Sequence, residues 1–220
     1  MRARLLVLAA VAGLGTLGGA SSLRAQARAQ NSIDPASLPA RETHQGVTIA
    51  VKPLVSEAAY EAQFSGRNPY QAGILALEVF FRNDNDKPIR LKLDTMRLLV
   101  ERSGQPRQRI EPLSAEEVAD RVLLNTPPDP RVPRLPLPGS RTPNTSRDKN
   151  WQEFAARMQA AGIPSDIVGP KSTVRGFLFF DVDHHYDWLT DARLDVPDLA
   201  FIPNNQALFF FQVDLAPALR

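Results

Sequence analysis

Apolar and polar positions alternate along several stretches of the chain, and this period of two predicts β-strands with one buried face. The clearest stretch is 73–82, where one face is large and apolar and the other is mixed. Further stretches are 47–51, 96–100, 174–182 and, last, 207–215. The predicted buried positions are Val47, Ile49, Val51, Leu75, Leu77, Val79, Phe81, Met96, Leu98, Val100, Val174, Leu178, Phe180, Val182, Phe209, Phe211, Val213 and Leu215.

The residues that follow the clearest strand have the composition of a turn. Residues 83–86 read Asn-Asp-Asn-Asp, residue types that tolerate left-handed backbone angles. Apolar alternation then resumes over 89–93. The pattern predicts a β-hairpin that pairs 73–82 with the strand beginning at Ile89.

The stretch 105–171 lacks this alternation of apolar and polar residues, and it contains two predicted helices. Ser114 and Glu117 have the spacing of a capping box, which predicts a helix over about 115–123. Asn150 and Glu153 repeat that spacing ahead of a second helix. The second helix has an apolar face at helical spacing and is expected to end at a Gly-x-Pro sequence; these residues are Trp151, Phe154, Ala155, Met158, Gly162 and Pro164.

A proline-rich segment joins the two predicted helices. Its prolines recur at every third position, which is the period of a polyproline II helix, so they form one edge of it. Two arginines share a neighbouring edge. One interpretation is an exposed ligand for an aromatic-lined groove on a partner, and the simpler one is a stiff connector. The residues concerned are Pro127, Pro130, Arg131, Pro133, Arg134 and Pro136.

Two parts of the chain carry a family resemblance. Leu-Ala-Leu-Glu-Val-Phe-Phe-Arg-Asn at 75–83, followed by Asp-Lys-Pro-Ile-Arg-Leu at 86–91, resembles the strand, Asn turn and Lys-Pro strand of immunoglobulin-like domains in exported bacterial proteins of unknown function. Residues 174–180, Val-Arg-Gly-Phe-Leu-Phe-Phe, are similar to a later strand of those domains. The resemblance implies a sandwich fold and no catalytic residues, because these domains share none. The chain departs from antibody-type domains because it has no cysteine pair.

The order of the predicted elements agrees with that resemblance. Strands separated by turns, without regular alternation of strand and helix, favour an antiparallel sandwich. We therefore predict a mainly β fold, an antiparallel immunoglobulin-like sandwich with a helical, proline-rich insertion at about 105–171.

The N-terminus has the pattern of a secretory signal peptide. Arg2 and Arg4 precede an apolar run at 5–17, and Ala-Gln-Ala at 25–27 is a small-x-small cleavage site. The run is too short to span a bilayer, and no later segment is long and apolar enough to do so. We expect a signal peptide over 1–27, a flexible lead-in over 28–45 and a single domain over 46–220. The chain is then exported, to the periplasm or beyond the cell.

Composition narrows the possible functions. The chain has 26 basic and 24 acidic residues, and removal of 1–27 takes away three arginines and no acid, which leaves a net charge of −1. A nearly neutral chain lacks the basic surface that attracts nucleic acid or anionic lipid, so neither is expected as a partner. The absence of cysteine excludes thiol nucleophiles and thiolate metal sites.

One cluster has the character of a metal site. Asp183, His184 and His185 lie at the exit of the strand 174–182, between Asp181 and Asp187. Imidazole and carboxylate ligands suit zinc, iron or copper, and an open position on the metal activates water. In an extended chain, however, His184 points away from the other two, and adjacent histidines in a polar loop commonly face solvent.

These observations leave two functions open. The first is an exported, non-enzymatic β-sandwich that binds an unknown envelope protein or surface component, or has a structural role in the envelope, without a cofactor. The second is a metal-binding protein or metal-dependent hydrolase that uses Asp183, His184 and His185. We predict no catalytic residue, because the sequence contains no complete set of nucleophile, base and stabilising groups.

Overall fold

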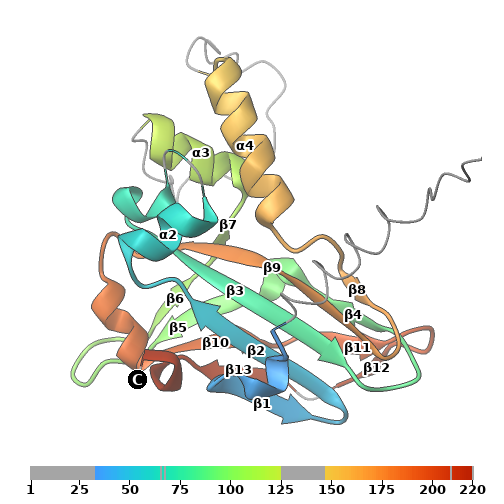
Figure 1. Cartoon of the computed structure of the whole chain (residues 1–220). Coiled ribbons are helices and arrows are strands. Elements are labelled where there is room, and N and C mark those ends of the chain that lie inside the picture. Colours follow the sequence, from blue (N-terminus) through green and yellow to red (C-terminus); the bar gives the residue numbers. More distant parts are fainter. Residues whose placement is uncertain (1–32, 65, 67, 125–146, 209, 220) are drawn as a thin grey trace, which may run out of the picture. The chain divides into compact units, whose positions relative to one another are not determined.

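The strands in the described part of the chain form three sheets. The computed structural model describes residues 33–64, 66, 68–124, 147–208 and 210–219 (Figure 1). Residues 35–220 make up one compact unit, and all pairings between its named strands are antiparallel. The protein is therefore a mixed α and β structure with mostly antiparallel sheets.

We name the sheets A, B and C. Sheet A has the order β1 (Ala40–His44), β2 (Val47–Pro53), β3 (Ile74–Asn83), β9 (Ser172–Asp181), β7 (Pro112–Leu113). Sheet B has the order β12 (Gln206–Ala207), β11 (Leu199–Phe201), β4 (Ile89–Leu91), β8 (Ile167–Val168). Sheet C has the order β13 (Phe211–Asp214), β10 (Ala192–Val196), β5 (Arg97–Val100), β6 (Gln108–Ile110).

Short helices connect and cover these sheets. The α-helices are α2 (Glu57–Gln63), α3 (Ala115–Leu124) and α4 (Lys149–Ala161). The 3₁₀ helices are η1 (Pro35–Ser37), η2 (Pro69–Ala72), η3 (Leu93–Thr95), η4 (Tyr186–Asp191) and η5 (Ala216–Leu219).

Sheet A lies between two hydrophobic clusters. Its first face, with Leu75, Leu77, Val79 and Phe81 of β3, packs against strands of sheets B and C. Its second face, with Ile74 and Ala76 of β3 and two phenylalanines of β9, packs against α2, α3 and α4. Figure 1 shows these helices grouped on one side of β3 and β9. The predicted central strand and its buried face are thus confirmed.

The predicted hairpin between β3 and β4 is wrong. β3 already has β2 on one side and β9 on the other, so it has no free edge, and β4 pairs with β8 and β11 in sheet B. The fully buried Asn83 stabilises the segment through which the chain passes from β3 in sheet A to β4 in sheet B. Its amide donates to the carbonyls of Lys87 at 2.8 Å and Gly169 at 3.0 Å.

The predicted last strand over 207–215 is also only partly right. The chain pairs with β11 at β12, leaves that sheet, and pairs with β10 at β13. Phe210 lies between the two strands and is 60% exposed, so the apolar run is interrupted by a residue that faces solvent. A turn at 202–205 joins β11 to β12.

Two predicted boundaries change. Residues 40–44, expected in a flexible lead-in, form β1 and pair with β2 along their whole length. Four of these five residues are at least partly exposed, so the strand lacks the alternation by which the others were found. The insertion expected over 105–171 contains β6, β7 and β8 besides α3 and α4. The predicted signal peptide, 1–27, lies outside the described residues.

Both predicted helices are present. α3 has the expected capping box, in which the Ser114 backbone N–H donates to Glu117 and the Glu117 N–H donates to Ser114 Oγ. α4 buries the expected apolar face, but it begins earlier than predicted, with Asp148 as its N-cap accepting from the Trp151 backbone N–H at 3.0 Å. The capping box at Asn150 is therefore wrong.

Candidate functional site: a groove in the helical layer

A layer of helices covers part of sheet A because α3 and α4 each bury one apolar stripe. Val118 and Ala119 of α3 are fully buried, and α4 contributes Phe154 and Met158 at helical spacing. These side chains share a cluster with Phe177 and other residues of β9. The layer is therefore held by apolar packing on the sheet.

Polar contacts also fix α3 against α4. The carboxylate of Asp120 accepts from the indole Nε1 of Trp151 at 2.8 Å and from the guanidinium of Arg147 at 2.8 Å. The Arg147 guanidinium also lies over the Trp151 ring, 4.6 Å from its centroid. Asp120 of α3 is thus joined through one oxygen to Trp151 of α4 and through the other to Arg147, which lies just before α4.

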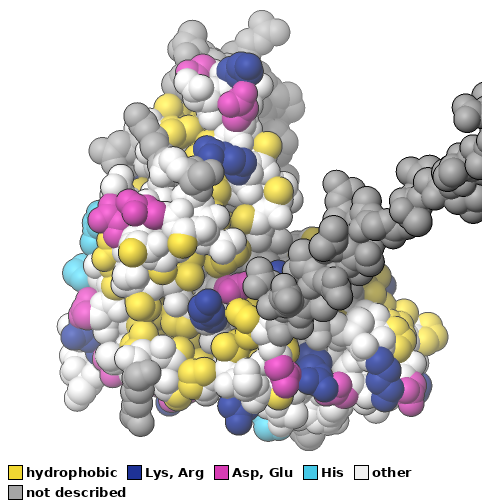
Figure 2. Space-filling view, viewed as in Figure 1, with side chains coloured by type: hydrophobic (Ala, Val, Ile, Leu, Met, Phe, Trp, Pro, Cys, Tyr) yellow, Lys and Arg dark blue, Asp and Glu magenta, His cyan; other side chains and the backbone are white. Residues whose placement is uncertain are grey.

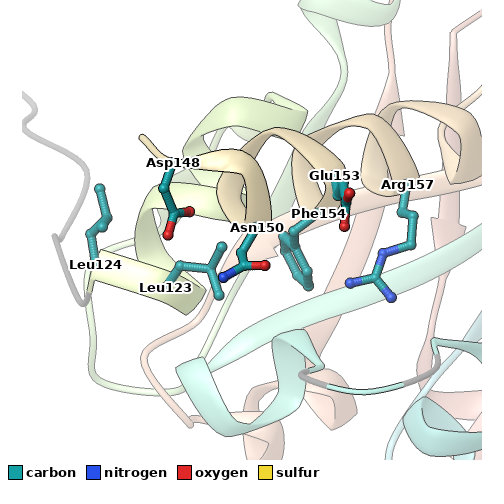
Figure 3. Close-up of a pocket in the computed structure, with 7 residues that line it drawn as sticks. All are labelled: Leu123, Leu124, Asp148, Asn150, Glu153, Phe154 and Arg157. Atoms are coloured by element: carbon teal, nitrogen blue, oxygen red, sulfur yellow. The ribbon is translucent and has the colours of Figure 1, made fainter. Parts of the chain in front are cut away.

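A groove of about 390 Å³ opens between the end of α3 and one side of α4 (Figure 3). Leu123 and Leu124 of α3 form one wall. The side chains from α4 follow the spacing i, i+3, i+4 and i+7 from Asn150, so they share one face of the helix. The lining residues are Leu123, Leu124, Asp148, Asn150, Glu153, Phe154 and Arg157.

The groove is apolar at its base and charged at its rim. Phe154 is almost fully buried, and the Arg157 guanidinium lies over its ring, 5.3 Å from the centroid. Glu153, 61% exposed, lies 3.5 Å from the ammonium of Lys149. The polar groups among the described lining residues are two carboxylates, one amide and one guanidinium. The volume and mixed lining of the groove suit binding of an amphipathic group.

The residues of the predicted metal cluster form a turn. Asp183 and His184 have left-handed φ angles of 45° and 66°, so they are not the extended chain assumed above. The turn lies against Gly73, where an added Cβ would come within 2.7 Å of the His184 backbone nitrogen. The absence of a side chain at this glycine therefore makes the close approach possible.

The side chains of Asp183 and His185 have contacts within the protein. Asp183 Oδ1 accepts from Arg121 of α3 at 3.2 Å, and its backbone N–H donates to Asp181 Oδ1. The His185 ring stacks on Trp188 with centroids 4.6 Å apart. In the part of the chain that the structure describes, no three His, Cys, Asp or Glu side chains are grouped so that they could hold a metal ion.

Arg121 gives the acidic turn a structural role. Its side chain is only 14% exposed, and its Nε lies 3.6 Å from Asp181 Oδ2 at the end of β9. The guanidinium thus joins α3 to both Asp181 and Asp183. Arg121 lies in the last turn of the helix predicted over 115–123. No local pattern links it to Asp183, which is about sixty residues away in the sequence.

A tyrosine cluster supports the same end of the helical layer. Tyr60 donates its hydroxyl proton to the Ile74 carbonyl at 2.9 Å and accepts from the Ala76 N–H at 2.7 Å. Tyr186 stacks on Tyr70 and donates to the Tyr70 carbonyl at 2.8 Å. Burial raises the pKa of both Tyr60 and Tyr186 well above the usual range of tyrosine.

The proline-rich segment that was predicted to bind a partner lies outside the described residues. Its predicted binding residues are Pro127, Pro130, Arg131, Pro133, Arg134 and Pro136. Within the described ranges, no helix is both long and apolar enough to cross a membrane. On the face seen in Figure 2, basic side chains lie among acidic ones rather than in a patch of one sign.

Comparison with known proteins gives a weak structural similarity and no family. No family model matches the chain, and its sequence matches no curated protein. A solved structure of a functionally unknown protein from Listeria monocytogenes EGD-e is similar to it, with a TM-score of 0.31 and 15% identity. The match covers 70% of this chain and 68% of the other. A similarity at this level carries no argument about fold or function.

Proposed function

We propose that this chain is an exported, non-enzymatic binding module that recognises a protein or surface component of the cell envelope through the groove between α3 and α4. The observation that carries the proposal is the groove itself, an apolar base with a rim of opposite charges on two helices fixed by Asp120. Export rests on the signal-peptide pattern at 1–27. Location in the periplasm or outside the cell follows from it.

The proposal includes the finer fold assignment. Sheets A and C would correspond to the two sheets of the immunoglobulin-like sandwich that the sequence resembles, and sheet B and the helices would be additions to it. Proteins built on rigid sheets commonly bind through such additions, because loops and insertions vary without disturbing the core.

Site-specific photo-crosslinking tests the groove. A photo-reactive residue at Asn150 in the rim, introduced into the protein in its own cells, is expected to give a defined adduct. The same residue at Arg109, an exposed position on β6, is the control. Identical adducts from both positions, or none from Asn150, would show that the groove is not the binding site.

Charge reversal sharpens that test. Glu153→Lys reverses a charge on the rim, whereas Glu61→Lys makes the same change on the exposed surface of α2. If the rim recognises the partner, the Asn150 adduct should fall several-fold with the first variant and stay unchanged with the second. Equal effects of the two variants would contradict specific recognition by the rim.

Export is tested separately by cell fractionation and N-terminal sequencing. The mature protein should begin at Arg28 and be absent from the cytosol. A cytosolic protein that retains residues 1–27 would overturn export and leave the groove unaffected.

Metal analysis tests the non-enzymatic part of the proposal. The protein purified without a tag or chelator should contain no stoichiometric zinc, iron or copper, and EDTA should leave its melting temperature unchanged. A metal bound only by the folded state raises stability, so a melt that EDTA lowers would support the hydrolase alternative instead.

A further inference from the structure

The groove between α3 and α4 has two unlike ends. Figure 3 shows Leu123, Leu124 and Asp148 towards one end and Arg157 at the other. The first end is therefore apolar and acidic, and the second is basic. A partner that complements both ends carries opposite charges in a fixed order, with an apolar group between them.

Asp148 has one carboxylate oxygen available to a partner at the acidic end. Its Oδ1 accepts from the Trp151 backbone N–H as the N-cap of α4, whereas its Oδ2 accepts no hydrogen bond from the described residues. Leu124 in the same end of the groove is only partly buried. A lysine or arginine suits this end, because its aliphatic stem packs on leucine while its charged head reaches a carboxylate.

Asn150, between the two ends, favours an extended peptide as the occupant. Its side chain is exposed, and its amide is both a donor and an acceptor. Such an amide pairs with the backbone N–H and C=O of an extended peptide. In a bound helix those groups already bond to each other within the helix. Leu123 and Phe154, which line the groove with Asn150, suit an apolar side chain of the same peptide.

The basic end suits an acidic side chain. The Arg157 guanidinium lies over the Phe154 ring, 5.3 Å from its centroid. A guanidinium is planar and has five N–H donors, so it still offers donors to a carboxylate while its face rests on a ring.

The length of the groove sets the spacing of the partner's side chains. Asp148 and Arg157 are nine residues apart, which is about 13 Å along a helix that rises about 1.5 Å per residue. An extended peptide rises about 3.3 Å per residue and covers that length in about four residues. Its side chains i, i+2 and i+4 point to the same side, so three of them face the groove.

We propose that the partner presents an extended segment with a lysine or arginine at i, a large apolar residue at i+2 and an aspartate or glutamate at i+4. The base lies at Asp148, and the acid lies at Arg157. The apolar residue packs between Leu123 and Phe154, while Asn150 bonds to the peptide backbone. This inference rests on the proposed function, because it names the chemistry of the partner that the groove binds.

Titration of the full-length mature protein with synthetic peptides, followed by NMR, tests this order. The probes are capped heptapeptides with the central sequences Lys-Ala-Leu-Ala-Glu, Lys-Ala-Leu-Ala-Lys and Lys-Ala-Ser-Ala-Glu. The first should bind about two- to fivefold more tightly than the second, which is the ratio for one exposed ion pair. The third should bind about tenfold more weakly than the first, because it lacks the apolar side chain.

Three variants of the protein sharpen the titration. Arg157→Glu should reverse the preference between the first two peptides, because an acid replaces a base. Asp148→Asn should weaken the first peptide about two- to fivefold and leave α4 capped, since asparagine is as good an N-cap as aspartate. Glu61→Lys, on the exposed surface of α2, should change neither. Equal binding of the first two peptides, or the same preference in Arg157→Glu, would overturn the proposed order.

The outcomes also separate this inference from the proposed function. If the photo-crosslink at Asn150 forms its specific adduct while the three peptides bind equally or not at all, the order of charges is wrong and the groove is still the binding site. If no specific adduct forms either, both the inference and the proposed function are wrong.

Discussion

The two faces of sheet A are covered in different ways. The face towards sheets B and C is closed, and the β3 residues on it, from Leu75 to Phe81, are at most 1% exposed. On the opposite face of β3, Ile74 and Ala76 are buried beneath helices, but Glu78 and Arg82 are only partly buried. The closed face supplies a continuous core, whereas the other face is covered by helices, two of which also form the groove.

This difference indicates where stability and recognition reside. The inner cluster draws residues from sheets A, B and C, so its loss affects the whole unit. The outer cluster draws on three helices and a few strand positions, so its loss is expected to be local. The following changes test that division, beginning with the largest expected effect.

Truncation of the inner core should be the most damaging change. Phe81→Ala removes a fully buried ring, and we expect it to lower the free energy of unfolding by about 3–5 kcal/mol in urea denaturation. The matched control is Phe210→Ala, which removes a ring that is 60% exposed and should change stability by less than about 0.5 kcal/mol. Similar losses in the two variants would contradict the assignment of the core.

Truncation on the helical face should cost less and act locally. Phe154→Ala removes a buried ring beside an existing groove, so little new cavity forms, and we expect a loss of about 3 kcal/mol. Hydrogen exchange should show amides of α3 and α4 losing protection while those of β3 and β9 keep it. Uniform loss of protection would show that the helices and sheets form one cooperative unit.

Removal of one hydroxyl tests the link between the helical layer and β3. Tyr60→Phe leaves the buried Ala76 N–H without its acceptor, and the expected loss is about 2 kcal/mol. Tyr70→Phe is the control, because its ring packs beside Tyr60 while its hydroxyl makes neither of these bonds. Equal losses would mean that the hydrogen bonds of Tyr60 add nothing.

The same residue has a predicted pH signature. Because burial raises the pKa of Tyr60 above that of an unfolded tyrosine, the unfolded state loses its proton first as pH increases. The free energy of unfolding should therefore fall above about pH 10, the ordinary tyrosine pKa. Tyr60→Phe should make that fall shallower; an unchanged slope would contradict the assigned burial.

The smallest expected effect concerns the start of α4. Asp148→Ala removes the N-cap and should cost about 1 kcal/mol, whereas Asn150→Ala should cost less than about 0.5 kcal/mol. Thermal unfolding of the two variants compares them directly. A larger loss at Asn150 would favour the cap predicted from the sequence.

Local pattern was enough to locate β2, β3, β4, β5, β9 and β13 and the helices α3 and α4, but it missed α2 and strands such as β10. Alternation marked β3 and its buried face, and the Ser114 capping box marked α3, because both signals depend on neighbours in the chain. β1 gave no such signal, because one edge strand with exposed side chains need not alternate. One-sided burial is not sufficient either, because β10 alternates buried and more exposed residues and was not predicted.

Pairing and the groove were beyond the reach of local pattern. The residues at 83–86 favour a turn whether or not β3 pairs with β4. β3 cannot pair with β4 because β2 and β9 occupy both edges of β3. The groove likewise depends on Leu123 meeting Phe154 across a helix pair. The turn at Asp183 escaped prediction because Arg121 and Gly73, both distant in sequence, shape it.

The pairing of β3 with β9 has a consequence for how the chain is made. Its register runs from Ile74 opposite Asp181 to Asn83 opposite Ser172, so the centre of sheet A joins segments about a hundred residues apart. Contacts of such long range close slowly. When the ribosome has synthesised only the first half of the chain, the very apolar β3 has β2 available but lacks β9, and chaperone protection matters most during that interval.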